Sequence, residues 1–193
     1  SRGVPTSAQP LPRLKLLLIG TLFAGQALTA FFGLERLPAG TFVVLFYSYP
    51  AMVAILELFM GERLTKLAWV ALGLTLVGII LTAPDFSAGL SGDNLPGVLM
   101  ALADAFMVAI YFLITSRVLR NHADTVRASA WSITGALVLL GGVGVVHGVN
   151  VPSGAAWLYL IALALVSTVM PVFALNSGLK LLGSTRSAII ATF

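Results

Sequence analysis

The sequence has no cysteine and few charged residues, and both shortages narrow the classes of protein that it can encode. Without cysteine it has neither a disulfide framework nor a cysteine-based metal or redox site. Charged residues make up 9% of the 193 residues, whereas a soluble domain carries about 25%. So few charges cannot cover a water-exposed surface, and this excludes an ordinary soluble domain.

Ligand clusters and nucleotide-binding motifs are also missing. His122 and His147 have no second histidine or cysteine at ligand spacing, so we expect no metal site. No glycine-rich loop ends in Lys-Ser or Lys-Thr, which argues against ATP hydrolysis. We also find no nucleophile paired with a base among the apolar segments. We therefore expect no cofactor and no enzymatic activity.

What the sequence has instead is long apolar runs. Hydrophobic residues make up 59% of the chain, and they gather into six stretches near the roughly 20 residues that a membrane-spanning helix needs. The runs are continuous and rich in Leu, Ala and Gly, which indicates helices and not strands. They cover residues 14–34, 41–60, 67–83, 95–115, 126–149 and 155–177, and a seventh begins near 187 and is cut off at 193. The predicted fold class is an all-α membrane protein, a polytopic helical bundle.

The basic residues predict the orientation of this bundle. Ten of the eleven lysines and arginines fall on one side of the predicted spans, and Arg36 is alone on the other. Cytoplasmic loops carry such an excess, so we expect an inner (plasma) membrane protein with the N-terminal end of the chain in the cytoplasm. Because the basic residues are scattered over four short loops, we interpret them as topology determinants and expect no nucleic-acid partner.

A weak internal repeat relates the two halves of the chain. A shift of 145 positions lays Gly33 and Leu34 on Gly178 and Leu179, at the same helix-to-loop junction. Five predicted spans separate the two copies, so the copies point in opposite directions. An inverted repeat of this kind is common among secondary transporters.

The segment YSYPAMVAILELFMGERLTKLAWVALGLTLVGIILTA, residues 47–83, carries a family resemblance. A proline inside the helix, Pro50, is followed by a closing Gly61-Glu62 pair and by a helix with Gly73 and Gly78. With GVLMALADAFMVAIYFLITSRVLR and NSGLKLLGSTRSAIIATF in the second half, this pattern resembles the EamA-type branch of the drug/metabolite transporter superfamily. The resemblance covers nearly the whole chain.

The resemblance implies ten helices in two inverted five-helix repeats, with a substrate cavity between the halves. On that template the chain holds helices three to eight and the start of nine. Residues 1–83 are then the C-terminal part of the first repeat, 84–94 an external linker loop, and 95–193 the N-terminal part of the second repeat. Counting 145 positions on from Pro50 and Glu62 predicts a second proline near 195 and a second Gly-Glu pair near 207.

Asp104 is the most informative single residue because it lies in the middle of the run 95–115. An ionised carboxylate at that depth costs about 2.5 to 3.5 kcal/mol, which implies a partner, a water-filled cavity or a bound proton. On a helix Asp104 shares a face with Val108, Tyr111 and Thr115. We hypothesise that this stripe lines the substrate path and that Asp104 couples transport to protons. The alternative is a protonated Asp104 that hydrogen-bonds to a neighbouring helix.

Glu57 and Pro50 are candidates in the run 41–60. Glu57 shares a face with Tyr47 and Pro50 and is a second proton-coupling candidate; alternatively its carboxylate reaches the membrane interface. Pro50 removes a backbone hydrogen bond in mid-helix, which a membrane tolerates only where a polar group can approach. Pro171 does the same in the run 155–177. Two proline-broken helices in opposite halves indicate a central binding site, although their positions do not align under the 145-residue shift.

Other polar and aromatic residues complete the candidate substrate-binding set. Gln26, one turn before Thr29, and Asn176 either hydrogen-bond a substrate or join helices. Tyr47 and Tyr111 are suited to stack on an organic cation or a flat metabolite. We further predict that Gly141, Gly144 and Gly148 mark close helix packing. The full set is Gln26, Tyr47, Pro50, Asp104, Tyr111 and Asn176.

Together these features predict a secondary transporter that exports a small metabolite, amino acid or drug-like compound by alternating access. Its partners are the small-molecule substrate, the lipid bilayer and protons. A channel or a non-transporting assembly subunit is the alternative, and a membrane-embedded enzyme is less favoured. A channel would be expected to show aligned polar rings without broken helices. The sequence leaves the substrate and the oligomeric state open.

Overall fold

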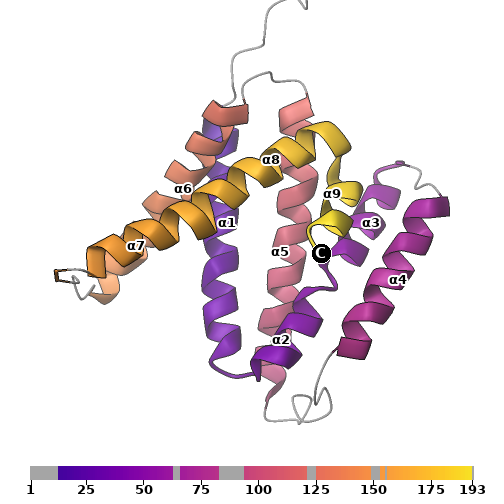
Figure 1. The fold of residues 1–193 in the computed structure, drawn as a ribbon, viewed down its shortest axis with the longest axis horizontal. Helices are drawn as coiled ribbons and strands as arrows, with labels where there is room; N and C mark the ends of the chain where they lie inside the picture. The colour runs from indigo at the N-terminus through magenta and orange to yellow at the C-terminus, as the bar shows by residue number, and fades with distance from the viewer. Residues whose placement is uncertain are drawn as a thin grey trace, which may run out of the picture. The chain divides into compact units, whose positions relative to one another are not determined.

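The computed structural model describes residues 13–62, 66–82, 94–120, 125–148, 153–154 and 156–192. These residues form helices and turns and contain no strand, which confirms the all-α fold class (Figure 1). The elements are α1 (Arg13–Leu34), α2 (Ala39–Phe46), α3 (Tyr49–Phe59), α4 (Lys66–Thr82), α5 (Leu95–Arg120), α6 (Thr125–His147), α7 (Ala156–Ala164), the π-helix η3 (Leu165–Val169), α8 (Met170–Leu182) and α9 (Ser184–Ile190).

Five stretches of the described chain are long and apolar enough to cross a bilayer. They are α1, the α2–α3 pair over Ala39–Phe59, α5, α6 and the continuous stretch Ala156–Leu182. Five of the six predicted spans are therefore confirmed. The run 67–83 forms α4, which has 17 residues and falls below the length of the other five. A helix of that size is at the lower limit for spanning, roughly 17 to 25 residues.

The exposed side chains are largely apolar, as lipid requires. Phe59 is 86% exposed and Val145 is 83% exposed, and α7 buries none of its residues. Soluble monomers rarely expose large contiguous apolar patches. The chain is a multi-pass membrane protein.

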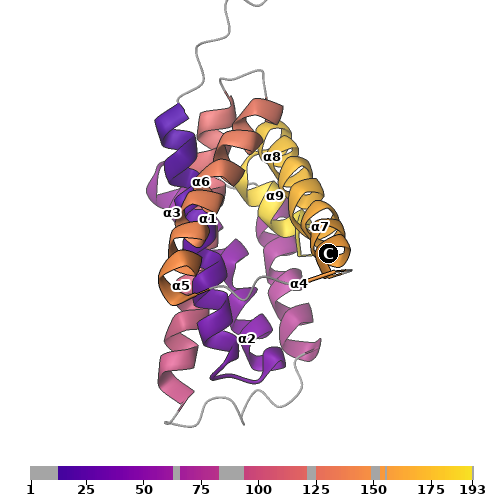
Figure 2. The ribbon, with the colours of Figure 1, turned by 90° about the vertical axis from the view of Figure 1, so that its left-hand side faces the viewer.

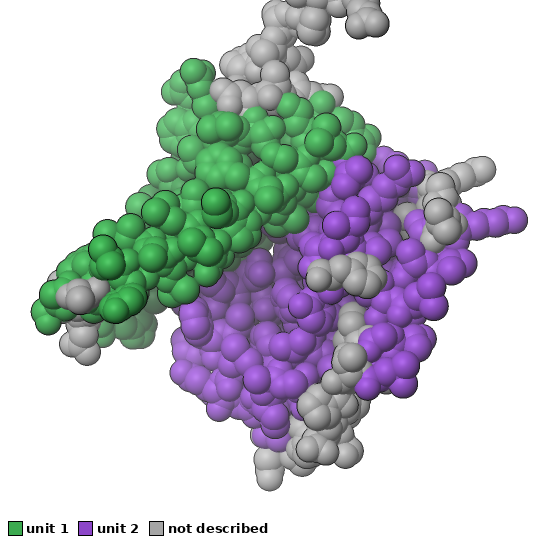
Figure 3. All heavy atoms as spheres, viewed as in Figure 1, with its two compact units in different colours: residues 1–24, 115–181 green, residues 25–114, 182–193 purple. Residues whose placement is uncertain are grey.

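The chain divides into two compact units, coloured separately in Figure 3. Unit 1 contains residues 1–24 and 115–181, and unit 2 contains residues 25–114 and 182–193. Helices α1 and α5 therefore each contribute residues to both units. The predicted repeat boundaries at 83 and 95 stay a prediction, and residues 84–93 of the predicted linker lie outside the described part.

Unit 1 is built around a close crossing of α1 and α6. A Cβ atom added to Gly20 would overlap the carbonyl oxygen of Ser132, and one added to Gly135 would overlap that of Leu17. The two backbones approach this closely because neither glycine has a side chain. The prediction for Gly141 and Gly148 was wrong: a Cβ atom at either position meets no atom of the described residues within 4 Å.

The stretch α7–η3–α8 in unit 1 is a single rod (Figures 1 and 2). Pro171 is the second residue of α8, two residues after the end of the π-helical turn Leu165–Val169. A π-helical turn lets a helix continue past a residue that cannot make the regular hydrogen bond. The predicted irregularity therefore exists, and it lies just before the proline.

The span Ala39–Phe59 in unit 2 is broken, but at a different place from the one predicted. Helix α2 ends at Phe46, Tyr47 and Ser48 form a turn, and α3 begins at Tyr49. Pro50 thus lies in the first turn of α3, where a backbone N–H has no partner within the helix in any case. The prediction that Pro50 removes a mid-helix hydrogen bond was wrong, because the helix already stops before it.

Helix α9 packs against α3 and α4 within unit 2. It begins at Ser184, which is 145 positions after Ala39, the first residue of α2. Both short helices end in a turn, at Tyr47–Ser48 and at Ala191–Thr192. The element boundaries thus repeat with the spacing found in the sequence, and α9 begins three residues before the predicted start near 187.

Candidate functional site

The polar stripe predicted on α5 is buried. Asp104, Val108, Tyr111 and Thr115 are each 4% exposed or less, whereas Leu99 of the same helix is 58% exposed. The four side chains recur every three or four residues, so they share one helical face. The sequence therefore identified correctly which face of α5 points inward.

Within the described residues, the Asp104 carboxylate has one polar contact, and that contact is weak. Its Oδ1 atom lies 3.5 Å from the hydroxyl oxygen of Thr29 on α1, at the long limit for a hydrogen bond. The Thr29 hydroxyl is also 2.9 Å from the carbonyl oxygen of Gln26, and a hydroxyl has only one proton to donate. Among the described residues no lysine, arginine or histidine pairs with this carboxylate. A buried carboxylate without a countercharge requires a proton or a cation.

In the described part of the chain, Gln26 is connected to this carboxylate only through the Thr29 hydroxyl. It is half-buried, stands one turn before Thr29 and accepts the Thr29 hydroxyl with its main-chain carbonyl. Helices α1 and α5 come near each other here, since a Cβ atom at Gly25 would be 3.5 Å from the sulfur of Met107. The Thr29 hydroxyl on α1 therefore lies between the main-chain carbonyl of Gln26 and the Asp104 carboxylate of α5, within unit 2.

Aromatic rings gather around the break between α2 and α3. We define the aromatic cluster as Phe46, Tyr47, Tyr49 and Phe112. The Phe46 and Tyr49 rings are 5.3 Å apart between centroids, Tyr47 and Tyr49 6.3 Å, and Tyr49 and Phe112 5.6 Å. Such separations are typical of favourable aromatic pairs. Tyr49, just after the break in the span, contacts Phe112 of α5, and Tyr47 within the break contacts Tyr49.

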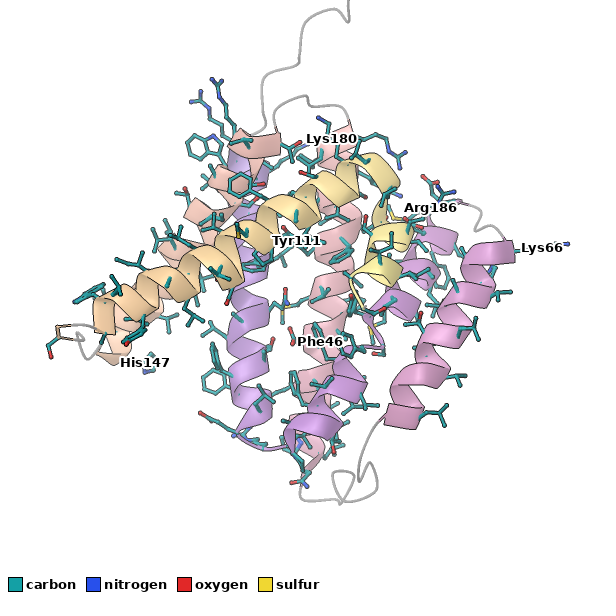
Figure 4. The ribbon with its side chains drawn as sticks, in the orientation of Figure 1. Phe46, Lys66, Tyr111, His147, Lys180 and Arg186 are labelled. Carbon is teal, nitrogen blue, oxygen red and sulfur yellow. The ribbon has the colours of Figure 1, made fainter. Side chains whose placement is uncertain are left out.

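Tyr111 joins this cluster through its neighbour, with the Tyr111 and Phe112 ring centroids 6.3 Å apart. Figure 4 labels Phe46 on α2 and Tyr111 on α5. Tyr111 is also seven residues, about 10 Å along the helix axis, after Asp104. Of the predicted set, Asp104 and Tyr111 lie on one face of α5, and Tyr47 belongs to the aromatic cluster. A substrate-binding role for these residues and for Gln26 stays a prediction. Pro50 is buried in the first turn of α3, next to Tyr49.

Glu57 contacts α9. Its carboxylate accepts hydrogen bonds from the hydroxyl groups of Ser184 and Thr185. The residue is half-buried, so its carboxylate is held by protein groups and does not extend freely to the interface. Its possible role in proton coupling stays a prediction.

The end of α3 positions Glu57 through the Gly61-Glu62 pair. Gly61 has a positive φ of 84°, the N–H of Glu62 donates to the carbonyl of Glu57 at 3.0 Å, and the N–H of Gly61 donates to that of Leu58 at 3.0 Å. This hydrogen-bond pattern is the Schellman motif that ends many helices. The pair therefore closes α3 as predicted and fixes the turn that carries Glu57.

Asn176 belongs to unit 1 and joins two helices there. Its side-chain nitrogen donates to the hydroxyl of Ser129 on α6 at 2.8 Å, and it is 1% exposed. This contact is the helix-joining role that the sequence left open. A role in substrate binding stays a prediction.

No group of three histidine, aspartate or glutamate residues gathers in the described part of the chain. His147 ends α6, and His122 lies outside the described residues.

Comparison with known protein families identifies the family of the chain. The EamA-like transporter family matches residues 2–83 and 95–193. The chain belongs to the EamA-like transporter family. This confirms the resemblance found in the sequence, and the match includes every helix that contributes to the Thr29–Asp104 contact and the aromatic cluster.

Individual EamA relatives support the assignment. The chain is 30% identical over 188 residues to the uncharacterized transporter YdfC of Bacillus subtilis. This alignment covers 93% of the chain and 60% of the relative. It is 29% identical over 170 residues to an uncharacterized transporter of Synechocystis, with 83% and 49% of the two chains covered. The chain thus spans about half to three fifths of the length of these curated relatives.

A solved crystal structure shows the same fold. It superposes with a TM-score of 0.76 at 21% identity and covers 99% of this chain and 66% of that chain. At this identity the similarity concerns the fold alone. It extends over the whole described chain and includes the short helices α2 and α9.

The sequence alone did not indicate Tyr49 or the pair Ser184 and Thr185 as site residues. Tyr49 had one available signal, because it lies two residues after Tyr47 and directly before Pro50. Ser184 and Thr185 follow Gly183, whose φ of 81° sets the start of α9. A hydroxyl pair at a helix start is so common that only the neighbouring carboxylate makes it informative.

Proposed function

We propose that this EamA family member is a secondary transporter that exports a small metabolite, amino acid or drug-like compound across the inner membrane by alternating access. The observation that carries the proposal is the buried Asp104 carboxylate, which has no cationic partner among the described residues. A structural carboxylate at this depth would be paired. One without a partner is suited to bind a proton or a substrate cation in turn.

The surroundings of Asp104 support a class of substrate. A carboxylate beside a threonine hydroxyl, with Gln26 one turn before that threonine on α1, favours a protonated amine with further hydrogen-bonding groups. The aromatic cluster lies about two helical turns further along α5, and aromatic faces attract cations and pack against flat or apolar bodies. We infer that the substrate carries an amino group at one end and an apolar or aromatic body at the other.

The broken spans support a carrier over a channel. Helices α2 and α3 and the π-helical turn before α8 interrupt two stretches that could otherwise be regular helices. Discontinuous helices are typical of transporters whose halves move around a midplane site. The basic loops support the orientation in which the N-terminal end of the chain is cytoplasmic.

Uptake by proteoliposomes tests the proposal. The full-length protein is reconstituted, and uptake of labelled amino acids, nucleobases and organic cations is measured with and without a pH gradient. We expect uptake of at least one amine-bearing compound that exceeds protein-free vesicles and increases with the gradient. Uptake at the protein-free level for every compound would refute a transport function.

Replacing Asp104 with asparagine tests the proposed coupling. Asparagine preserves the shape of the side chain but cannot take up a proton. We expect gradient-driven uptake by Asp104→Asn to fall at least tenfold, to the level seen without a gradient. Glu35→Gln is the matched control, since Glu35 is an exposed carboxylate, and we expect no change there. Unaltered gradient-driven uptake by Asp104→Asn would remove the coupling role.

A further inference from the structure

Two contacts connect α3 and α9, one at each end of the paired segments. At the C-terminal end of α3 the Glu57 carboxylate accepts hydrogen bonds from Ser184 and Thr185. Toward its N-terminal end the Tyr49 hydroxyl donates to the carbonyl of Ala188 at 3.2 Å. The start of each helix therefore meets the later part of the other, so α3 and α9 run antiparallel within unit 2.

These contacts connect segments from the two halves of the sequence. Helix α3 belongs to the predicted first repeat and α9 to the predicted second repeat. Helix α9 is the 145-residue counterpart of α2, which precedes α3 in the same span. Two repeat-related spans thus meet with opposite directions. In transporters with inverted repeats, the movement of one repeat against the other opens and closes access to the site.

The chemistry of the Glu57 contact suits repeated opening. Its donors are two hydroxyl groups, and among the described residues no lysine or arginine pairs with the Glu57 carboxylate. Water can replace a hydroxyl donor without leaving a second charge unpaired, whereas separation of a buried ion pair would strand two charges. Glu57 is half-buried and lies in the last turn of α3.

Flanking charges indicate the side of the membrane at which the contact lies. Lys66 begins α4 just after the end of α3, and Arg186 lies one residue after Thr185 (Figure 4). Both belong to the basic set that predicts cytoplasmic loops. The Glu57 end of the α3–α9 pair is accordingly at the cytoplasmic end of its spans, and the Tyr49 end is deeper.

We propose that Glu57, Ser184 and Thr185 form a cytoplasmic gate, which must separate once in each transport cycle to admit substrate from the cytoplasm. The proposal rests on the proposed transport function. The Tyr49 contact with Ala188 is the inner part of the same gate. Glu57 acts here as a positioning residue that holds α9 and does not touch substrate.

The absence of native cysteine from the chain provides a clean test by reversible cross-linking. Glu57→Cys and Thr185→Cys are introduced together into the full-length protein, provided that any cysteines elsewhere in it are replaced, and uptake is measured after oxidation and again after reduction. We expect oxidation to lower uptake at least tenfold and reduction to restore it. The single variants Glu57→Cys and Thr185→Cys, oxidised in the same way, are the controls, and the uptake of each should be the same before and after oxidation.

The outcomes separate failure of the gate from failure of the transport function. If the oxidised, cross-linked protein transports as fast as the same protein after reduction of the disulfide, the gate proposal is wrong and the transport function stands. If the parent protein transports none of the compounds tested, the transport function itself fails, and the gate fails with it.

A second variant keeps the proposal testable if the double-cysteine protein is inactive even when reduced. Ser184→Ala combined with Thr185→Val removes both donors while preserving small or isosteric side chains. With Ala188→Cys as the reporter, which is fully buried, we expect a membrane-impermeant maleimide added from the cytoplasmic side to react several-fold faster than in the parent. An unchanged labelling rate overturns the gate, because a merely structural contact would alter protein yield without changing this accessibility.

Discussion

Gly61 sets the position of Glu57 because it ends α3 with a positive φ of 84°. A Cβ atom added there meets no atom of the described residues within 4 Å, so the effect of a substitution would come from backbone conformation alone. An L-residue in the left-handed region costs roughly 1 to 2 kcal/mol, and asparagine tolerates it better than alanine.

We therefore expect Gly61→Ala to lower the stability of the full-length protein in detergent by about 1 kcal/mol, with a smaller loss for Gly61→Asn. Thermal unfolding measures both. Gly73→Ala is the matched control, because Gly73 lies within α4 and has equally open surroundings; alanine there should be neutral or slightly stabilising. Equal stability of Gly61→Ala and the parent would show that the Schellman turn does not hold α3.

The burial of single residues could be predicted where it depends on their depth in a span and on the period of the helix. Asp104 and its stripe could be assigned to the buried face because a carboxylate in mid-span cannot face lipid. The partners of Glu57 could not be assigned, since the sequence does not say which helix lies next to α3. The same holds for Asn176 and Ser129, which lie 47 positions apart and meet only because α8 packs against α6.

Helix crossings follow from the positions of glycine, but only structure shows which glycines take part. Gly20 and Gly135 form the α1–α6 crossing, whereas Gly141 and Gly142 on α6 have open surroundings in the described part. From the sequence we predicted close packing at the C-terminal end of α6, where glycines are frequent. The contact lies instead at the isolated Gly135, which faces α1.

Alanine substitutions test this crossing directly. Gly20→Ala and Gly135→Ala each place a methyl group against a main-chain carbonyl, which overpacks the contact and costs roughly 1 to 3 kcal/mol. We expect both variants to lose thermal stability and monodispersity in detergent. Gly141→Ala and Gly142→Ala, in the same chain and with open surroundings, should behave like the parent. A destabilisation of similar size in all four would contradict the crossing.

The sequence predicted correctly that two spans are interrupted, but it did not predict the residues at which the interruptions lie. Proline marks the neighbourhood of each break, because the preceding backbone must do without a regular hydrogen bond. In α2–α3 the break precedes Pro50 by two residues, and before Pro171 the helix widens into a π-helical turn. The local response depends on packing, which residue type alone does not determine.

For the whole molecule, composition and run length predicted the membrane class and five of the spans, because lipid as solvent imposes strict demands on both. The weak repeat at 145 residues reappears in the starts of α2 and α9. The aromatic cluster and the α3–α9 contact were not predictable, since both depend on how the helices associate.

Counterflow in proteoliposomes tests the central claim of alternating access most directly. Vesicles with the full-length protein are loaded with an unlabelled compound that the uptake screen identifies, and the same labelled compound is added outside at trace concentration. The account predicts that label accumulates transiently above its external concentration, several-fold faster than in unloaded vesicles, because the loaded carrier returns as it exchanges. Uptake that only reaches equilibrium and ignores the internal compound would identify a channel and contradict the account.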